Sequence, residues 1–446
     1  MKKTIYLLIL LISFGCQPKP TEKSINKRQT IADEIENSLK TEILEVWYPR
    51  VVDTLNGGYT SDYDYQWKKK GPQDKMIVTQ ARHIWTAAKA AEFYPENQVY
   101  EEVARHGFPF LRDKMWDQEY GGYYTLVNAQ GEVISEGDRI IKTAYGNAFA
   151  IYGLAALYKL TRDSDVLKQA IQSFQWLDKN SHDPQFKGYL QFMERDGTAI
   201  EEGWNDTPPK DQNSSIHLLE AFTELYQVWP DDTLRSRLEE MLILIRDVIV
   251  IPPGYLTLFS QKDWTPVSYR DSSEEVREAH HYHDHVSFGH DIETAYLLME
   301  ASEALGIHND EKTLTKAKQM ADHALEKGFD ESVGGLYDAG YYFKDQEGMA
   351  IIRDSNNWWA QSETLNTLLI MADLYDDPTY FSRFEKQWKY IKDNLIDHEN
   401  GGWYAGGIDK EPDRKTGNKS GIWKGAYHTA RALMNVSRRL TEEEKD

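Results

Sequence analysis

Cysteine is nearly absent from this 446-residue sequence, in which Cys16 stands alone. A single cysteine excludes an internal disulfide and a cysteine-rich metal site. Basic residues are in the minority as well: 51 lysines and arginines face 72 acidic residues, and the formal net charge is −21. Such an excess of negative charge disfavours nucleic acids and anionic membrane surfaces as partners. We therefore expect no nucleic-acid partner.

The apolar run near the N-terminus is about 11 residues long, as in a signal peptide, and a membrane span needs roughly 20. Residues 1–16, MKKTIYLLILLISFGC, combine a basic start, this run and Gly15 before Cys16. The pattern resembles a bacterial lipoprotein signal, in which the cysteine is lipidated and becomes the new N-terminus. Ser13 departs from it, since such signals usually carry leucine there. The alternative is an ordinary secretion signal with an incidental cysteine.

Residues 17–30 are polar, contain two prolines and are typical of a flexible tether. Together with a lipidated Cys16, this segment predicts a protein anchored in the bacterial cell envelope. The lipid anchor would be its only contact with the membrane. Residues 31–446 are then one catalytic domain.

A Gly-Gly-aromatic element repeats along the chain, and its second glycine recurs after gaps of 64, 66, 66, 81 and 67 residues. Five of the six copies also carry an aspartate four residues before the first position of the glycine pair. A near-constant period of this length indicates a repeat architecture. The six copies occupy residues 53–60, 117–124, 183–190, 252–259, 330–337 and 397–404.

Two kinds of helical pattern lie between the glycine elements. One kind is apolar on nearly all sides, which is typical of a buried helix. The other is amphipathic, as in residues 233–249 and 314–328. Six such pairs predict an all-α fold, an (α/α)6 barrel with short Gly-Gly-aromatic β-hairpins; an open solenoid is the alternative, but its ends would need polar caps. The six buried patterns are residues 79–95, 143–163, 213–229, 289–306, 358–375 and 424–440.

The first turns of the six inner helices carry polar and aromatic residues. In a closed ring these ends converge on the axis, where they form a cleft suited to a small molecule, and helix N-termini add positive potential. The residues expected there are Arg82, Lys142, Tyr145, Asn213, His217, His290, Glu293, Trp358, Trp359, Trp423 and His428.

His217 and Glu220, like His290 and Glu293, stand three residues apart and therefore share a helix face. A di-iron bundle would use the reverse order, Glu-x-x-His, with further carboxylates. A zinc site wants three or more ligands. We therefore expect no metal ion in the cleft.

Several segments resemble the N-acylglucosamine 2-epimerase superfamily, most closely its cellobiose and mannobiose 2-epimerases. The resemblance covers nearly all of the chain after residue 40, and GHDIE and WK..YH..R are its most specific elements. It implies an (α/α)6 barrel and cofactor-independent proton transfer at C2 of a reducing sugar. The matching segments are ARHIWT at 81–86, KTAYGNAFAIYGL at 142–154, NSSIHLLEA at 213–221, SFGHDIE at 287–293, WWAQSE at 358–363 and GIWKGAYHTARA at 421–432.

The resemblance also implies residue roles. His290 and His428 would be the acid/base pair, and Arg82 would stabilise the enediolate oxygen. The remaining expectations are that His217 and Asn213 contact the sugar near C1 to C3, that Glu293 orients His290, that Trp423 and either Trp358 or Trp359 stack on sugar rings, and that Tyr145 and Glu363 complete the substrate site.

Elementary chemistry supports these roles. Epimerisation at C2 removes a proton from one face of the carbon and returns it on the other, so two bases must flank it. Histidine suits both roles because its pKa is near neutrality, and a fixed guanidinium can hold the oxyanion. Two departures, Ser215 and Tyr296, stand where the cellobiose epimerases carry His and Trp, and they leave the specificity for a disaccharide open.

Other interpretations remain. The barrel also hosts glycoside hydrolases and lyases, for which Glu220, Glu293 and Glu363 are the candidate acids. A lipid-anchored glycan-binding protein would need the tryptophans but not both histidines. The histidine-rich segment at 278–290 is a metal-binding loop or, as we favour, a mobile loop over the cleft. We expect a mono- or disaccharide substrate and a monomer or homodimer.

Overall fold

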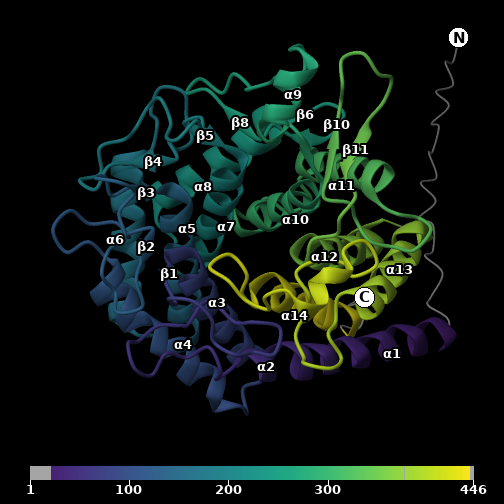
Figure 1. The fold of residues 1–446 in the computed structure, drawn as a ribbon, viewed down its shortest axis with the longest axis horizontal. Helices are drawn as coiled ribbons and strands as arrows, with labels where there is room; N and C mark the ends of the chain where they lie inside the picture. The colour runs from purple at the N-terminus through teal and green to yellow at the C-terminus, as the bar shows by residue number, and fades with distance from the viewer. Residues whose placement is uncertain (1–21, 376, 442–446) are drawn as a thin grey trace, which may run out of the picture.

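The computed structural model describes residues 22–375 and 377–441, and Figure 1 shows two concentric rings of helices. Cys16, the predicted signal and the first part of the tether lie outside this range. The helices of the inner ring are α3 (Ile77–Phe93), α5 (Ala144–Thr161), α7 (Gln212–Val228), α10 (Phe288–Ala304), α12 (Trp358–Leu374) and α14 (Tyr427–Thr441). The outer ring consists of α1 (Glu22–Ser38), α4 (Gln98–Phe110), α6 (Ser164–Ser181), α8 (Asp232–Leu244), α11 (Glu311–Gly328) and α13 (Pro378–Asn394). The predicted (α/α)6 barrel is confirmed.

Shorter helical segments complete the rings. π-helical turns extend three of the outer helices: η1 (Leu39–Leu44), η2 (Leu111–Met115) and η3 (Ile245–Ile249). The others are α2 (Glu45–Trp47), α9 (Glu274–His280), η4 (His281–His283) and η5 (Pro412–Thr416). Among the described residues, no helix combines the length and hydropathy needed to cross a bilayer.

The ring closes where the two ends of the chain meet, because α14 packs against both α3 and α1. Helix α1 begins at Glu22, so the predicted tether over 17–30 extends too far, and residues 22–30 are helical. The helix forms because its continuation buries an apolar face, which includes Ala32, Ile35 and Leu39, against the rest of the barrel. Arg28 adds a 3.0 Å contact from its Nη2 to Asp373 Oδ1. Helix α1 is thus the outer partner of α14.

The apolar core lies between the two rings, and the inner helices approach one another closely. Gly153 of α5 shows this best: a Cβ there would lie 2.7 Å from the backbone oxygen of Ala81 in α3. Residues such as Ala150 and Leu219 are fully buried. The inner helices are therefore enclosed except at their ends, as their apolar sequence predicts.

The Gly-Gly elements form tight turns in the loops that lead from an outer helix to the next inner helix. In the second copy, Gly121 and Gly122 have φ of 73° and 72°, a region that only glycine adopts at no steric cost. Asp117 caps the turn, and the Lys142 ammonium donates to Asp117 Oδ2 at 3.0 Å. Lys142 was expected in the cleft, but it is fully buried under this turn. Equivalent pairs join Lys75 to Asp53 at 2.8 Å, Lys210 to Asp183 at 2.9 Å and Lys419 to Asp397 at 2.5 Å.

Short antiparallel strand pairs link the loops that precede neighbouring inner helices. The ladders are β1 (Lys75–Met76) with β2 (Leu126–Val127), β3 (Lys142–Thr143) with β4 (Phe192–Met193), β5 (Lys210–Asp211) with β8 (Phe259–Ser260), β6 (Val250–Ile251) with β7 (Tyr255–Leu256), and β9 (Val286–Ser287) with β10 (Ala339–Tyr341) and β11 (Ala350–Arg353). The strands β1, β3, β5 and β9 lead directly into α3, α5, α7 and α10, and so they fix the starts of four inner helices, where the polar residues converge.

Candidate active site

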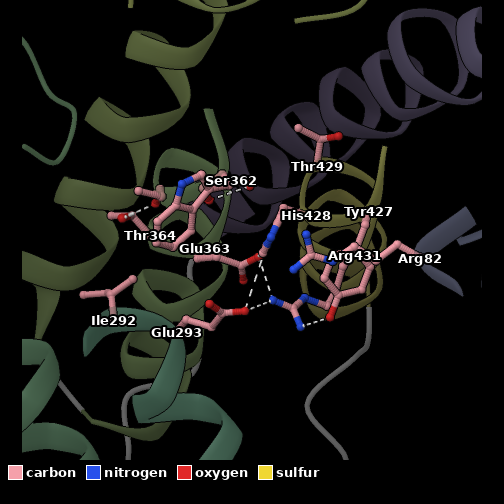
Figure 2. A network of polar contacts seen from close by, with 12 residues as sticks. Arg82, Ile292, Glu293, Ser362, Glu363, Thr364, Tyr427, His428, Thr429 and Arg431 are labelled. Atoms are coloured by element: carbon pink, nitrogen blue, oxygen red, sulfur yellow. Dashed lines mark hydrogen bonds and ion pairs between the residues drawn. The ribbon is translucent and has the colours of Figure 1, made fainter. Parts of the chain in front are cut away.

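A single arginine organises the polar residues on the barrel axis. Arg431 of α14 is 3% exposed, and its Nη2 lies 2.7 Å from Glu363 Oε1. Figure 2 shows the same guanidinium facing Glu293, and it also pairs with Glu220. Three carboxylates from α7, α10 and α12 thus share one cation. The sequence assigned no role to Arg431, although its place three residues after His428 puts it on the same helix face.

Two histidines are held by these carboxylates. His428 Nδ1 lies 2.7 Å from Glu363 Oε1, and His217 Nδ1 lies 2.8 Å from Glu220 Oε2. Glu363 was expected to bind substrate, but it supports His428 instead, and Tyr296 donates to its other oxygen at 2.7 Å. Tyr296 therefore belongs to this support rather than to the sugar-facing wall.

His290 has a different partner from the predicted one. Its Nδ1 lies 2.8 Å from the Ser287 hydroxyl in the turn before α10. Glu293 pairs with Arg431, and its Oε1 is 3.9 Å from His428 Nδ1. Glu293, expected to orient His290, thus pairs elsewhere, whereas His217 and Glu220, which their spacing placed on one helix face, are in contact. In all three histidines Nδ1 is engaged, which leaves Nε2 for the cleft.

The electrostatics keep His290 and His428 neutral. Burial lowers the pKa of His290 to about 3, and the nearby positive charge of Arg82 acts in the same direction. Burial also holds the pKa of His428 well below its usual value, against the attraction of Glu293. Both rings are therefore in the uncharged base form at neutral pH, which is the form that can take a proton from carbon.

The carboxylates differ among themselves. Burial alone would raise the pKa of Glu220, but Arg431 and His217 outweigh it and lower the value to about 2. Burial raises the pKa of Glu363 in spite of Arg431. Glu220 is thus a permanent anion beneath His217, while Glu363 is the more readily protonated member of the cluster.

Arg82 occupies the position that an oxyanion needs. Its guanidinium stacks over Phe149 at 4.2 Å and Tyr427 at 4.9 Å, and its Nη2 is 3.2 Å from the Tyr145 hydroxyl. Among the described residues no carboxylate forms an ion pair with it. Asn213, at the start of α7, lies near the Tyr145 hydroxyl. Arg82 therefore keeps its charge for a ligand.

The tryptophans separate into three environments. The Trp359 ring lies 4.7 Å from the ring of His290 and 5.6 Å from that of His428. Trp423 is 56% exposed at the mouth, 6.4 Å from Tyr145. Trp358 packs against Lys424 instead. Of the two alternatives for the inner stacking platform, the geometry favours Trp359.

The geometry also bears on metal binding. Glu293, Glu363 and His428 offer ligand atoms that lie within 4.8 Å of one another. The guanidinium of Arg431 already contacts both carboxylates, however. A metal ion would have to displace this cation, so the arrangement favours the prediction of a metal-free site.

The two remaining sequence features lie around the cleft. Ser215 is buried, and its hydroxyl donates to the Asp211 carbonyl at 2.7 Å, so it serves the first turn of α7. The histidine-rich segment forms α9 and η4 just before β9, where the His280 ring stacks on Tyr269 at 4.4 Å. Whether this segment moves over the cleft stays a prediction.

Comparison with known proteins agrees with this geometry. The family model for N-acylglucosamine 2-epimerase matches residues 57–432. A cellobiose 2-epimerase from Bacteroides fragilis is 28% identical over 92% of this chain and 99% of its own, and a D-mannose isomerase from Marinomonas mediterranea is 24% identical over 89% and 94%. The solved cellobiose 2-epimerase of Bacillus thermoamylovorans superimposes with a TM-score of 0.80 at 25% identity, covering 92% of this chain and all of the other. The chain belongs to the N-acylglucosamine 2-epimerase family of carbohydrate epimerases and isomerases.

Proposed function

We propose that the protein is a cofactor-independent sugar 2-epimerase, or a closely related aldose–ketose isomerase. Its substrates would be mannose- or glucose-type reducing sugars, or β-1,4-linked disaccharides of them. The observation that carries the proposal is the pair of buried, neutral imidazoles, His290 and His428, whose rings lie 4.7 Å and 5.6 Å from the Trp359 ring, together with the Arg82 guanidinium, which forms no ion pair with a described carboxylate.

The reaction follows from this pair. One imidazole accepts the C2 proton of the open-chain aldose, and the C2 electron pair moves into an enediolate whose oxygen Arg82 stabilises. The other imidazole, protonated from solvent once the anionic enediolate has formed, donates that proton to the opposite face of C2, which gives the epimer, or to C1, which gives the ketose; the first imidazole then releases the proton it took to solvent. The sugar would stack on Trp359 while its ring is closed, and the second ring of a disaccharide would reach the exposed Trp423.

The test uses deuterated water. The protein is incubated with mannobiose, cellobiose, mannose or N-acetylglucosamine, and deuterium at C2 is measured by NMR and mass spectrometry. We expect deuterium at C2 of at least one of these sugars, together with its epimer or ketose. Absence of deuterium from all four would overturn the proposal.

A glycoside hydrolase or lyase is disfavoured by the carboxylates. An inverting hydrolase needs two carboxyl groups across a cleft, roughly 6.5–9.5 Å apart with a water between them. Here Glu220, Glu293 and Glu363 all converge on Arg431. A glycan-binding protein without catalysis would need the tryptophans but not two buried neutral histidines.

For the location, we propose a lipid anchor on Cys16 in the cell envelope. Cys16 precedes Glu22 by six positions, a reach of about 20 Å in an extended chain. Arg28 of α1 contacts Asp373 and the carbonyl of Arg439, both at the C-terminal ends of inner helices. The anchored end would therefore be opposite the catalytic mouth, which would face away from the membrane. Cys16→Ser should release the protein from the membrane fraction; retention would contradict the anchor.

A further inference from the structure

A second cavity lies at the opposite end of the barrel. It has a volume of about 670 Å³ and is lined by residues of the inner helices α3, α5, α7, α10, α12 and α14 and of the start of α11. Its inner end is formed by Glu220, Tyr296 and Arg431. The Arg431 cluster therefore separates this cavity from the catalytic cleft, and the proposed reaction makes no use of it.

The cavity contains a buried donor without an acceptor. Trp85 of α3 is 5% exposed, and its indole Nε1–H has no hydrogen-bond acceptor among the described residues. The ring stacks on Tyr152 with centroids 5.1 Å apart and planes 14° apart, and it lies edge-on to Tyr427. A fixed, desolvated N–H group loses free energy unless a partner with an oxygen atom occupies the cavity.

Acidic and apolar side chains line the same cavity as this donor. Glu300 of α10 lines the cavity and keeps its side chain exposed there. Glu224 also lines the wall, 2.5 Å from the Lys89 ammonium. Met299 and Ile370 contribute apolar surface between these polar groups.

The balance of charge selects the class of ligand. The lining holds five acidic side chains and four basic ones, the latter including Arg438 and Arg439. Such a balance suits neither a strong anion nor a multivalent cation. A neutral molecule with many hydroxyl groups fits better, because each hydroxyl can accept from an indole N–H and donate to a carboxylate while its C–H groups pack on apolar side chains.

We propose that this cavity is a second binding site, for a neutral sugar or polyol, separate from the catalytic cleft. The ligand accepts a hydrogen bond from Trp85 Nε1 and donates to Glu300. Because Arg431 lines the inner end of the cavity, the ligand would touch the arginine that pairs with Glu363, the carboxylate that supports His428.

The test monitors the indole group itself. The full chain carrying His290→Ala, which prevents conversion of the sugar, is labelled with ¹⁵N-tryptophan, and Trp85→Phe identifies the Trp85 cross-peak. Mannose, cellobiose and glycerol are titrated separately. We expect one or more of them to shift the Trp85 peak with an affinity on the order of millimolar; a shift with mannose or cellobiose indicates a sugar site, and one with glycerol alone a polyol site.

Two variants decide the outcome. Glu300→Ala, or the isosteric Glu300→Gln if the first is unstable, should weaken binding about fivefold or more. The matched control is Glu239→Ala, on the exposed face of α8 away from the cavity, which should leave the titration unchanged. A Trp85 peak that no compound moves would overturn the proposal, as would a shift that keeps its affinity in the Glu300 variants. The readout needs no turnover, so it is independent of the C2 deuterium test.

Discussion

Buried charges occur in two regions of this barrel, and they are arranged differently. Under the Gly-Gly turns each of four buried lysines pairs with an aspartate, and Lys142 also donates to the Gly121 carbonyl. On the axis, Arg431 alone serves three carboxylates, and two neutral histidines stand beside them. The first arrangement leaves no group free for a ligand. The second one directs histidine nitrogens into the cleft, so buried charge serves folding in one region and chemistry in the other.

The largest expected effect is a loss of activity when either histidine on the axis is removed. His290→Ala and His428→Ala, tested separately, should each lower the rate of C2 deuterium exchange by roughly 10²–10⁴-fold, because each removes one of the two bases. The free energy of unfolding, measured in urea, should change far less than the activity. Near wild-type exchange in either variant would show that the assigned residue is not a base.

Removal of Arg431 should lower both the stability of the protein and the rate of C2 exchange. Arg431→Met leaves Glu220, Glu293 and Glu363 buried without their cation, and breaking a buried ion pair costs about 3–5 kcal/mol. We expect a loss of that size in the free energy of unfolding. We also expect C2 exchange to be lost, because Glu363 and Glu220, which hold His428 and His217, no longer have the cation that fixes them. A stable and active variant would mean that the cluster is not the organising centre of the site.

Lys142→Met is the change under a Gly-Gly turn that corresponds to Arg431→Met on the axis. Asp117 keeps Arg195 at 3.0 Å as a partner, so the loss should be smaller, about 1–3 kcal/mol. Because Lys142 lies outside the cleft, kcat/KM of the folded variant should equal that of the wild type. A loss of kcat/KM without a loss of stability would instead support the original prediction that Lys142 belongs to the active site.

The smallest effect concerns pH. Burial depresses the pKa of His290 to about 3 in the folded protein, whereas an unfolded histidine has a pKa of about 6.5. Between these values the unfolded chain binds the extra proton, so stability falls as the pH drops below about 6.5, by up to roughly 1.4 kcal/mol per pH unit from this group. Urea unfolding at pH 7 and pH 5.5 should show a weaker decline in His290→Gln than in the wild type. Equal declines would show that His290 does not carry this dependence.

Sequence analysis reached most of the fold and part of the site. The six inner helices start within a few residues of the predicted positions, since apolar runs and glycine turns are local signals. His217 and Glu220 were placed on one helix face by their spacing, and the structure brings them into contact. The start of α1 at Glu22 was missed because the polar composition of 17–30 concealed a helix that packing on α14 stabilises.

The sequence by itself determined the number of repeats, the closed barrel, the family and the set of histidines at the starts of the inner helices. Only the tertiary structure decided which side chain holds each histidine. Glu363 reaches His428 from another helix, 65 positions away, while Glu293 turns to Arg431. Spacing along one helix cannot reveal such pairs, because they form only when ring closure brings separate repeats together and burial requires every charge there to find a partner.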